Sequence, residues 1–300
     1  MREGYIMKRG IIFLLCFIQL IYISTAFAQS TQITNGLNYL SSTQNPDGSW
    51  SGTVIRGMFP TTVASIETLS LLGQGNTAGY SNAVTWLQSH NLETTDYLAE
   101  RIHALSTPGT DLSLLLLYLD EVYTAAWGGY KDCEVNNIDT ALAVLALNKI
   151  NYSALDNISY ALGYLTRSQN ADGGFGFHFS SCAGCVGDES DVSTTALVLI
   201  VLSQFKSTYD LQTEINNAAT YLLAHQNPNG SFGEGTVYET ALAFEALIES
   251  GAVSAENYAV LQNAIVYLTS TQLPNGSWND DPYSTALALR EITEKETTKR

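Results

Sequence analysis

Four side chains in the middle of the chain could form a metal site. His178, Cys182 and Cys185 lie close together in "GFGFHFSSCAGCVGDESD" (174–191), and Cys133 stands ahead of the preceding apolar segment. Three thiolates and one imidazole are suitable ligands for tetrahedral zinc. In an oxidising compartment the same thiols suit a disulfide, either from Cys133 to Cys182 or Cys185, or within Cys-Ala-Gly-Cys. The sequence leaves both open, so zinc is a candidate cofactor and none is assigned.

Three carboxylates stand at the starts of apolar segments and could act as general acids. Asp139 and Glu239 each immediately precede Thr-Ala, and Asp191 lies four residues before another Thr-Ala. A catalytic acid needs a carboxyl in this kind of protected position. However, the first turn of a helix also favours carboxylates, as caps and as partners of the helix dipole. The capping interpretation needs no catalysis, and the catalytic residues stay unassigned.

The elements that would position these residues come from a repeat. Leu-x3-Gln-x3-Gly-x-aromatic occurs in "YLSSTQNPDGSW" (39–50), "YLTRSQNADGGF" (164–175), "YLLAHQNPNGSF" (221–232) and "YLTSTQLPNGSW" (267–278). The glycine predicts a sharp turn with positive φ. We expect the glutamine to bond free backbone groups at a helix end and tie an outer helix to the inner helix that follows it. The marked residues are Gln44, Trp50, Gln169, Phe175, Gln226, Phe232, Gln272 and Trp278.

Each copy lies between two helix-like segments. The segment after the turn is rich in Ala and Leu and apolar on most faces, as in "IDTALAVLALNKI" (138–150), which predicts a helix packed on both sides. Two weaker copies complete the series and give six helix pairs. The marker leucines are residues 40, 87, 119, 165, 222 and 268, about 46 residues apart. Because the first and last copies carry the fullest motif, we expect them to be neighbours in a closed ring rather than polar caps of an open array.

Leu-x3-Gln-x3-Gly-x-Trp resembles the QW repeat of squalene-hopene and oxidosqualene cyclases, shared more loosely by protein prenyltransferase β subunits. The resemblance covers nearly all of residues 33–293. It implies an all-α, α6/α6 toroid in which an outer helix ends at the glutamine and an inner helix lines the centre. We place this domain at residues 30–293, followed by a polar tail at 294–300.

The residues depart from the catalytic pattern of the family. Class II terpenoid cyclases carry Asp-x-Asp-Asp-Thr-Ala, whose middle Asp protonates the substrate. The two nearest matches, 191–196 and 136–141, have Ser193 and Ile138 there, neither of which is a strong acid. The predicted inner helices are also mostly aliphatic, whereas carbocation chemistry favours aromatic walls. Prenyltransferases bind zinc through an Asp-x-Cys pair, but here Asp132 directly precedes Cys133.

The resemblance places a ligand at the mouth of the ring, where the inner helices begin. Our first hypothesis is binding of an apolar small molecule there, without cyclase chemistry. The second is a metal-dependent transferase or lyase at the Cys/His rim. The third is a non-catalytic module that binds an envelope protein or a glycan. The predicted ligand contacts are Tyr130, Phe177, Phe179 and Tyr238.

The N-terminus predicts export. "MKRGIIFLLCFIQLIYISTAFA" has a cationic start, a short apolar run and a small-residue end, which is typical of a signal peptide at residues 1–28. We therefore expect a secreted or periplasmic protein, and no other stretch suits stable membrane insertion. The formal net charge of −16 argues against nucleic acid as a partner.

Overall fold

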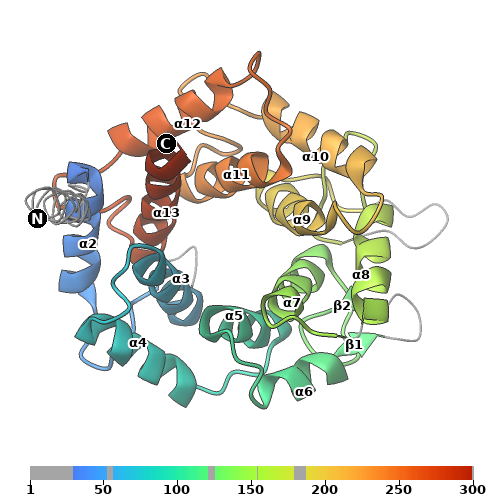
Figure 1. Cartoon of the computed structure of the whole chain (residues 1–300), viewed down its shortest axis with the longest axis horizontal. Coiled ribbons are helices and arrows are strands. Elements are labelled where there is room, and N and C mark those ends of the chain that lie inside the picture. Colours follow the sequence, from blue (N-terminus) through green and yellow to red (C-terminus); the bar gives the residue numbers. More distant parts are fainter. Residues whose placement is uncertain (1–29, 53–56, 121–125, 154, 179–186, 299–300) are drawn as a thin grey trace, which may run out of the picture. The chain divides into compact units, whose positions relative to one another are not determined.

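Twelve helices of the described residues alternate between an outer and an inner ring in the computed structural model (Figure 1). Contacts run around the inner ring from α3 through α5, α7, α9, α11 and α13 and back to α3. The expected all-α toroid is confirmed. The outer helices are α2 (Thr31–Thr43), α4 (Ala78–Ser89), α6 (Asp111–Leu117), α8 (Leu155–Arg167), α10 (Gln212–Ala224) and α12 (Ala259–Ser270). The inner helices are α3 (Met58–Leu71), α5 (Thr95–Leu105), α7 (Asn137–Lys149), α9 (Val192–Phe205), α11 (Val237–Ser250) and α13 (Pro282–Thr298).

The structure describes residues 30–52, 57–120, 126–153, 155–178 and 187–298. The predicted signal peptide lies outside these residues. Residues 32–300 form one unit, and the ring is described within it. The last inner helix, α13, continues to Thr298, past the expected boundary at residue 293. Among the described residues, the helices are accompanied by one short antiparallel pair of strands, β1 (Leu119–Asp120) with β2 (Ala126–Trp127).

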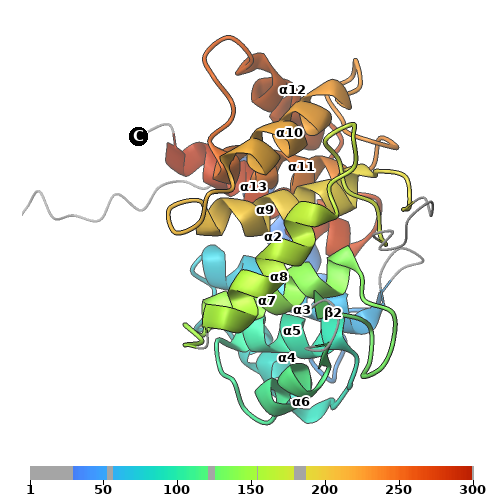
Figure 2. The same cartoon turned by 90° about the vertical axis from the view of Figure 1, so that its right-hand side faces the viewer.

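The inner and outer helices differ in how much of their surface is buried. Most residues of α9 are buried, because α10 packs against it from the outer ring and α7 and α11 flank it in the inner ring (Figure 1). Figure 2 shows these helices from the side of the ring. An outer helix buries one stripe only. In α12 the stripe is Leu261, Ala264, Ile265 and Leu268, at the spacing of one helix face, while Val266 is 60% exposed.

The repeated turn is held by two kinds of hydrogen bond that recur from copy to copy, one of them confined to the copies with Trp. The indole Nε1 of Trp50 donates to the oxygen of Leu40 at 2.8 Å, and that of Trp278 to the oxygen of Leu268 at 2.6 Å. The backbone N–H of each aromatic residue donates to the hydroxyl of a threonine in the first turn of the next inner helix, as from Trp278 to Thr285 at 3.0 Å. The aromatic side chains are fully buried, so these residues serve the architecture.

The glutamine joins neighbouring repeats, which corrects our expectation that it ties an outer helix to its own inner helix. Gln272 donates to the oxygens of Gly276 and Gln32, both at 2.9 Å. Gln44 makes the same pair of bonds to Gly48 and Gly79, at the start of α4. The amide thus satisfies a free carbonyl in its own turn and one in the first turn of the next outer helix.

The turn glycines have positive φ, as predicted, and also touch the next repeat. Gly276 has φ +89°, and a Cβ there would collide with the backbone oxygen of Asn35. Gly173 has φ +88°, and its Cβ would lie 2.7 Å from the oxygen of Asn217. An asparagine recurs at this contact, five residues before the marker leucine, and our sequence analysis missed it. These residues are Asn35, Asn82, Asn217 and Asn263.

The third repeat has a different marker from the one predicted. Trp127 Nε1 donates to the oxygen of Leu115 at 2.7 Å, the bond that its equivalents make to Leu40 and Leu268. Leu115, which is fully buried, therefore replaces Leu119 as the marker. The prediction was wrong because α6 is short and Leu119 begins the strand that pairs with Trp127.

The second repeat lacks the glutamine and uses an arginine instead. Arg101 on α5 donates two hydrogen bonds to the Asp111 carboxylate, at 2.6 and 2.7 Å. Its NH1 group also donates to the backbone oxygen of His90, where α4 ends. Arg101 is 5% exposed and joins the end of one outer helix to the start of the next. A bidentate guanidinium therefore substitutes for the amide.

Candidate functional site

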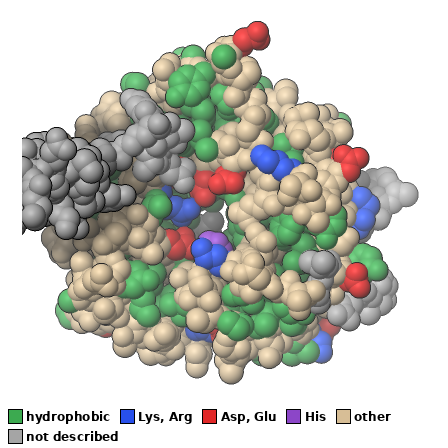
Figure 3. Space-filling model, in the orientation of Figure 1, with side chains coloured by type: hydrophobic (Ala, Val, Ile, Leu, Met, Phe, Trp, Pro, Cys, Tyr) green, Lys and Arg blue, Asp and Glu red, His purple; other side chains and the backbone are tan. Residues whose placement is uncertain are grey.

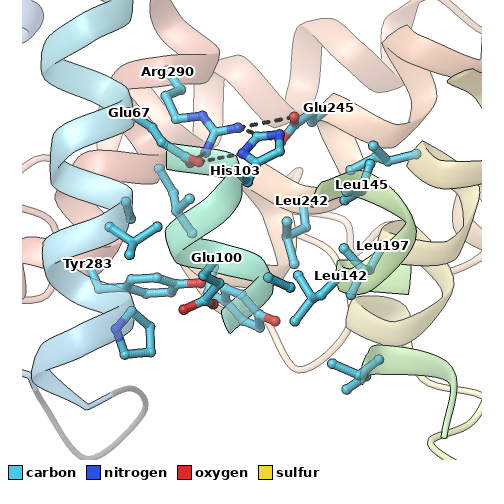
Figure 4. A pocket seen from close by; sticks show the side chains of 18 of the residues that line it. Glu67, Glu100, His103, Leu142, Leu145, Leu197, Leu242, Glu245, Tyr283 and Arg290 are labelled. Carbon is cyan, nitrogen blue, oxygen red and sulfur yellow. Dashed lines mark hydrogen bonds and ion pairs between the residues drawn. The ribbon is translucent and has the colours of Figure 1, made fainter. Parts of the chain in front are cut away.

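A cavity of about 160 Å³ lies at the centre of the inner ring. All six inner helices contribute to its wall, each with residues three or four apart. Most of these residues are aliphatic, whereas one end of the cavity has aromatic side chains and the other has charged ones (Figure 4). The cavity is therefore built by the repeat itself, because equivalent positions of successive inner helices face the same space.

Two tyrosines stand at the end where the inner helices begin. Tyr238 lies in the first turn of α11 and Tyr283 in the first turn of α13. Their ring centres are 5.8 Å apart, with the ring planes tilted by 40°. Both line the cavity together with Pro60 and Ile138 from α3 and α7. The wall is thus less uniformly aliphatic than the sequence suggested.

The middle of the cavity is apolar except at one position. Leu142, Leu197, Leu242 and Leu287 come from four consecutive inner helices, α7, α9, α11 and α13. Glu100 on α5 lies among them and points into the cavity, near Tyr283 (Figure 4). The apolar face can exclude water from an apolar ligand.

A layer of charged side chains lies at the other end, and we call Glu67, His103, Glu245 and Arg290 the polar layer. Glu67 Oε1 contacts His103 Nδ1 at 2.7 Å, and Glu67 Oε2 accepts from Arg290 NH1 at 3.2 Å. Arg290 NH2 donates to both oxygens of Glu245, at 3.1 and 3.3 Å. Each of the four side chains is from 19 to 34% exposed. Acidic, basic and histidine side chains surround the central hollow on this face (Figure 3).

The contacts within the polar layer favour the charged forms of Glu67 and Arg290. Burial raises the pKa of the Glu67 carboxyl, but the His103 hydrogen bond and the Arg290 charge outweigh it, so that this pKa lies below its ordinary value. The Glu245 and Glu67 carboxylates raise the pKa of Arg290, against burial that lowers it. Glu67 and Arg290 therefore remain ionised around neutral pH.

The polar layer was not predicted, although the sequence carries a signal for it. Glu67, Glu245 and Arg290 each stand five residues after the threonine whose hydroxyl caps the preceding turn. His103 occupies the same place on α5. Aligning the inner-helix segments would have shown a charged or histidine residue at this register in four of the six, with Leu145 and Ile200 in the other two. The ring then brings Glu67 and Arg290 together across 223 residues.

The three predicted carboxylates lie in helix caps rather than in the cavity wall. Asp191 is the N-cap of α9 and accepts from the Thr194 N–H at 2.8 Å and the Ser193 hydroxyl at 2.7 Å. Glu239 exchanges hydrogen bonds with Thr236, the N-cap of α11, at 3.1 and 2.9 Å. None of them is among the residues that line the cavity.

Asp139 lies in a buried cap that changes its acidity. Its backbone N–H donates to the Asn136 side chain at 2.8 Å, and the Asn136 amide donates back to its carboxylate. Burial raises the pKa of Asp139 to about 6, although the hydrogen bond from Asn136 lowers it. The carboxyl is 8% exposed and lies against the turn of Gly129, outside the cavity wall.

The predicted aromatic contacts divide between two places. Tyr238 lines the cavity, whereas Tyr130 is 50% exposed and packs beside Tyr118 at 6.3 Å. Phe177 is 39% exposed and lies edge-on to His178. Phe179 lies outside the described residues. A ligand role at the rim stays a prediction for these three.

The cysteine cluster falls largely outside the described residues. Cys133 is exposed before α7, and Cys182 and Cys185 are not described. His178 Nδ1 contacts Asp188 Oδ2 at 2.9 Å. Among the described residues, no three His, Cys, Asp or Glu side chains are grouped to hold a metal ion. The zinc site and the disulfide therefore both stay predictions.

None of the described helices is long and apolar enough to span a bilayer.

A central cavity walled by six inner helices defines an α/α toroid. The prenyltransferase alpha-alpha toroid domain family matches residues 61–279, and the chain belongs to this family. The terpenoid cyclase and prenyltransferase resemblance of the sequence is confirmed at this level. No curated protein sequence matches the chain at a significant level.

Solved structures of the same fold have several activities in their names. The apo type II terpene cyclase MstE from Scytonema superposes with a TM-score of 0.68 and 15% identity, covering 89% of this chain and 98% of that chain. ent-Copalyl diphosphate synthase from Streptomyces platensis has a TM-score of 0.58 and 17% identity, covering 78% of this chain and 49% of that chain. A possible member of the GH105 family from Salmonella enterica serovar Paratyphi A has a TM-score of 0.61 and 13% identity, covering 93% of this chain and 99% of that chain. At these identities the likeness shows the fold alone.

Proposed function

We propose that the protein is an exported toroid that binds an apolar small molecule in its central cavity. The observation that carries the proposal is the wall of four leucines on α7, α9, α11 and α13, closed by two tyrosines at one end and the polar layer at the other. Concave sites with an apolar lining and a few convergent polar groups are the usual form of small-molecule sites.

The size of the cavity limits the ligand. An apolar cavity of about 150 Å³ holds one benzene-sized molecule. A cavity of about 160 Å³ therefore suits a group of roughly six to eight heavy atoms, and a longer ligand would extend past the tyrosines. A six-carbon chain is a suitable first probe.

The proposed activity excludes protonation-initiated cyclisation. Ser193 occupies the place of the acid, and its hydroxyl donates to Asp191 at 2.7 Å. Asp191 in turn is engaged as a helix cap. We expect no cyclised product from a linear C20 or C30 polyprene, as followed by gas chromatography with mass spectrometry. A cyclised product would contradict this part of the proposal.

Calorimetric titration with 1-hexanol tests binding. Affinity should fall about fourfold for each methylene removed, as expected for burial of apolar chain. Leu242→Trp fills the cavity from α11 and should abolish the heat of binding. Ile248→Trp places the same residue on an exposed position of the same helix, at 37% exposure, and should bind as the parent does. Absence of binding to the parent, or equal binding by both variants, would overturn the proposal.

A further inference from the structure

We propose that the ligand of this cavity carries a positively charged hydrogen-bond donor, such as a primary amine, at the end that meets the polar layer. This inference deepens the proposed function and depends on it. The site is the space between the leucine wall and the polar layer, and the ligand class is an alkylamine or aralkylamine.

The charges that face the cavity are unbalanced. Three carboxylates line it, on Glu67, Glu100 and Glu245, against one guanidinium on Arg290 and one imidazole on His103. With the three carboxylates ionised, the residues that line the cavity carry more negative than positive charge, and Lys149, which lies outside the lining, adds one positive charge near Glu67. In a partly desolvated site such an excess attracts a cation more strongly than it would in water.

The hydrogen-bonding capacity is unbalanced in the same direction. A carboxylate offers about four lone-pair sites, so Glu67 and Glu245 together offer about eight. The polar layer uses four of them, one in the bond with His103 and three in bonds from Arg290. Acceptors thus remain for a ligand donor. Arg290, the strongest cation of the layer, already has both terminal nitrogens engaged and is poorly placed to receive an anion.

The rest of the cavity supports an organic rather than an inorganic cation. The leucines would exclude water from an alkyl chain, and the Tyr238 and Tyr283 rings stand at the opposite end. Among the residues that the structure describes, His, Cys, Asp and Glu side chains form no group suited to a metal ion. The guanidinium of Arg290 also lies between the two glutamates of the polar layer (Figure 4).

A head-group series at constant chain length tests the inference. Hexan-1-amine, 1-hexanol and hexanoate are titrated into the full chain by calorimetry at pH 7 and low salt. We expect the amine to bind on the order of tenfold tighter than the alcohol, and the carboxylate more weakly than either. Added salt should lower the affinity for the amine and leave the affinity for the alcohol unchanged.

Glu245→Gln removes one charge at nearly constant shape. It should bring the affinity for the amine close to that for the alcohol and leave the alcohol unchanged. Glu249→Gln, an exposed glutamate on the same helix, is the matched control and should change neither. Thermal unfolding of each variant verifies that it is folded.

The outcomes separate the inference from the proposed function. Equal binding of amine and alcohol by the parent would overturn the inference and leave cavity binding intact. Tighter binding of hexanoate would overturn it in favour of Arg290 as an anion receptor. Failure of all three probes would overturn the proposed function, and the inference with it.

Discussion

The side-chain amide of Gln272 donates a hydrogen bond to the backbone oxygen of Gln32, 240 residues earlier, at 2.9 Å. The same bond joins Gln44 to Gly79 and Gln169 to Glu214 between successive repeats. The chain therefore closes its ring with the interaction that it uses inside the ring. Thr68, whose hydroxyl donates to the Ala286 oxygen at 2.9 Å, makes a second link across the same seam.

Gln272→Ala should lower the free energy of unfolding by about 2 kcal/mol, because two carbonyl oxygens lose their donor. Urea unfolding followed by circular dichroism measures the change. Gln212→Ala, at an exposed glutamine of α10 that bonds only within its own helix, is the control. Equal stability of the two variants would show that the amide bonds do not hold the ring.

Gly276→Ala should destabilise the protein by on the order of 2 kcal/mol, because the residue has φ +89° and its new Cβ would meet the backbone of Asn35. Gly75→Ala is the matched control, since no atom lies within 4 Å of its added Cβ. The melting temperatures of the two variants give the comparison. A Gly276→Ala variant as stable as Gly75→Ala would contradict the close approach of α2 to this turn.

Arg101→Met should cost on the order of 3 kcal/mol, because it leaves Asp111 without its buried partner. Arg101→Lys keeps the charge but cannot make the forked contact, and should lose part of the same stability. Arg167→Met, at an exposed arginine on α8, measures the cost of losing an arginine elsewhere. If Arg101→Met unfolds no more easily than Arg167→Met, the arginine does not replace the missing glutamine.

Asp139→Asn should change the pH dependence of stability. The folded-state pKa of about 6 lies above the ordinary aspartate pKa of 3.8, so the folded state holds a proton that the unfolded state releases between these values. The Asp139 carboxyl therefore contributes fully to the free energy of unfolding below about pH 4, and this contribution is lost as the pH rises through 6.

The variant should match the parent near pH 4 and exceed its free energy of unfolding at pH 7 by on the order of 2 kcal/mol. Urea unfolding at the two pH values measures the difference. Asp210→Asn, at an exposed aspartate, measures the general effect of removing one charge. A difference between variant and parent that is constant with pH would contradict the burial of the Asp139 carboxyl.

The sequence predicted the parts of the fold that repeat. The Gln-Gly-aromatic frame located four turns, and the neighbouring first and last copies implied the closed ring that Gln272 and Gln32 form. Local departures were harder to predict. A short α6 moved the third marker from Leu119 to Leu115, and Arg101 compensates for a missing glutamine from a different helix.

The polar layer could not be located from any single segment. Each of its members is one charged or histidine residue on a helix of its own, and such a residue usually indicates a solvated face. The four meet only because the ring places equivalent positions of α11, α13, α3 and α5 around one cavity. Tyr238, by contrast, was predicted as a ligand contact and does line the cavity.

A crystal structure of the protein soaked with 6-bromohexan-1-ol would show whether the central cavity binds an apolar chain. The anomalous signal of bromine locates the ligand without reference to its shape. We expect one bromine peak inside the ring, among Leu142, Leu242 and Leu287. A peak on the rim beside Tyr130 or Phe177, with none inside the ring, would contradict this expectation.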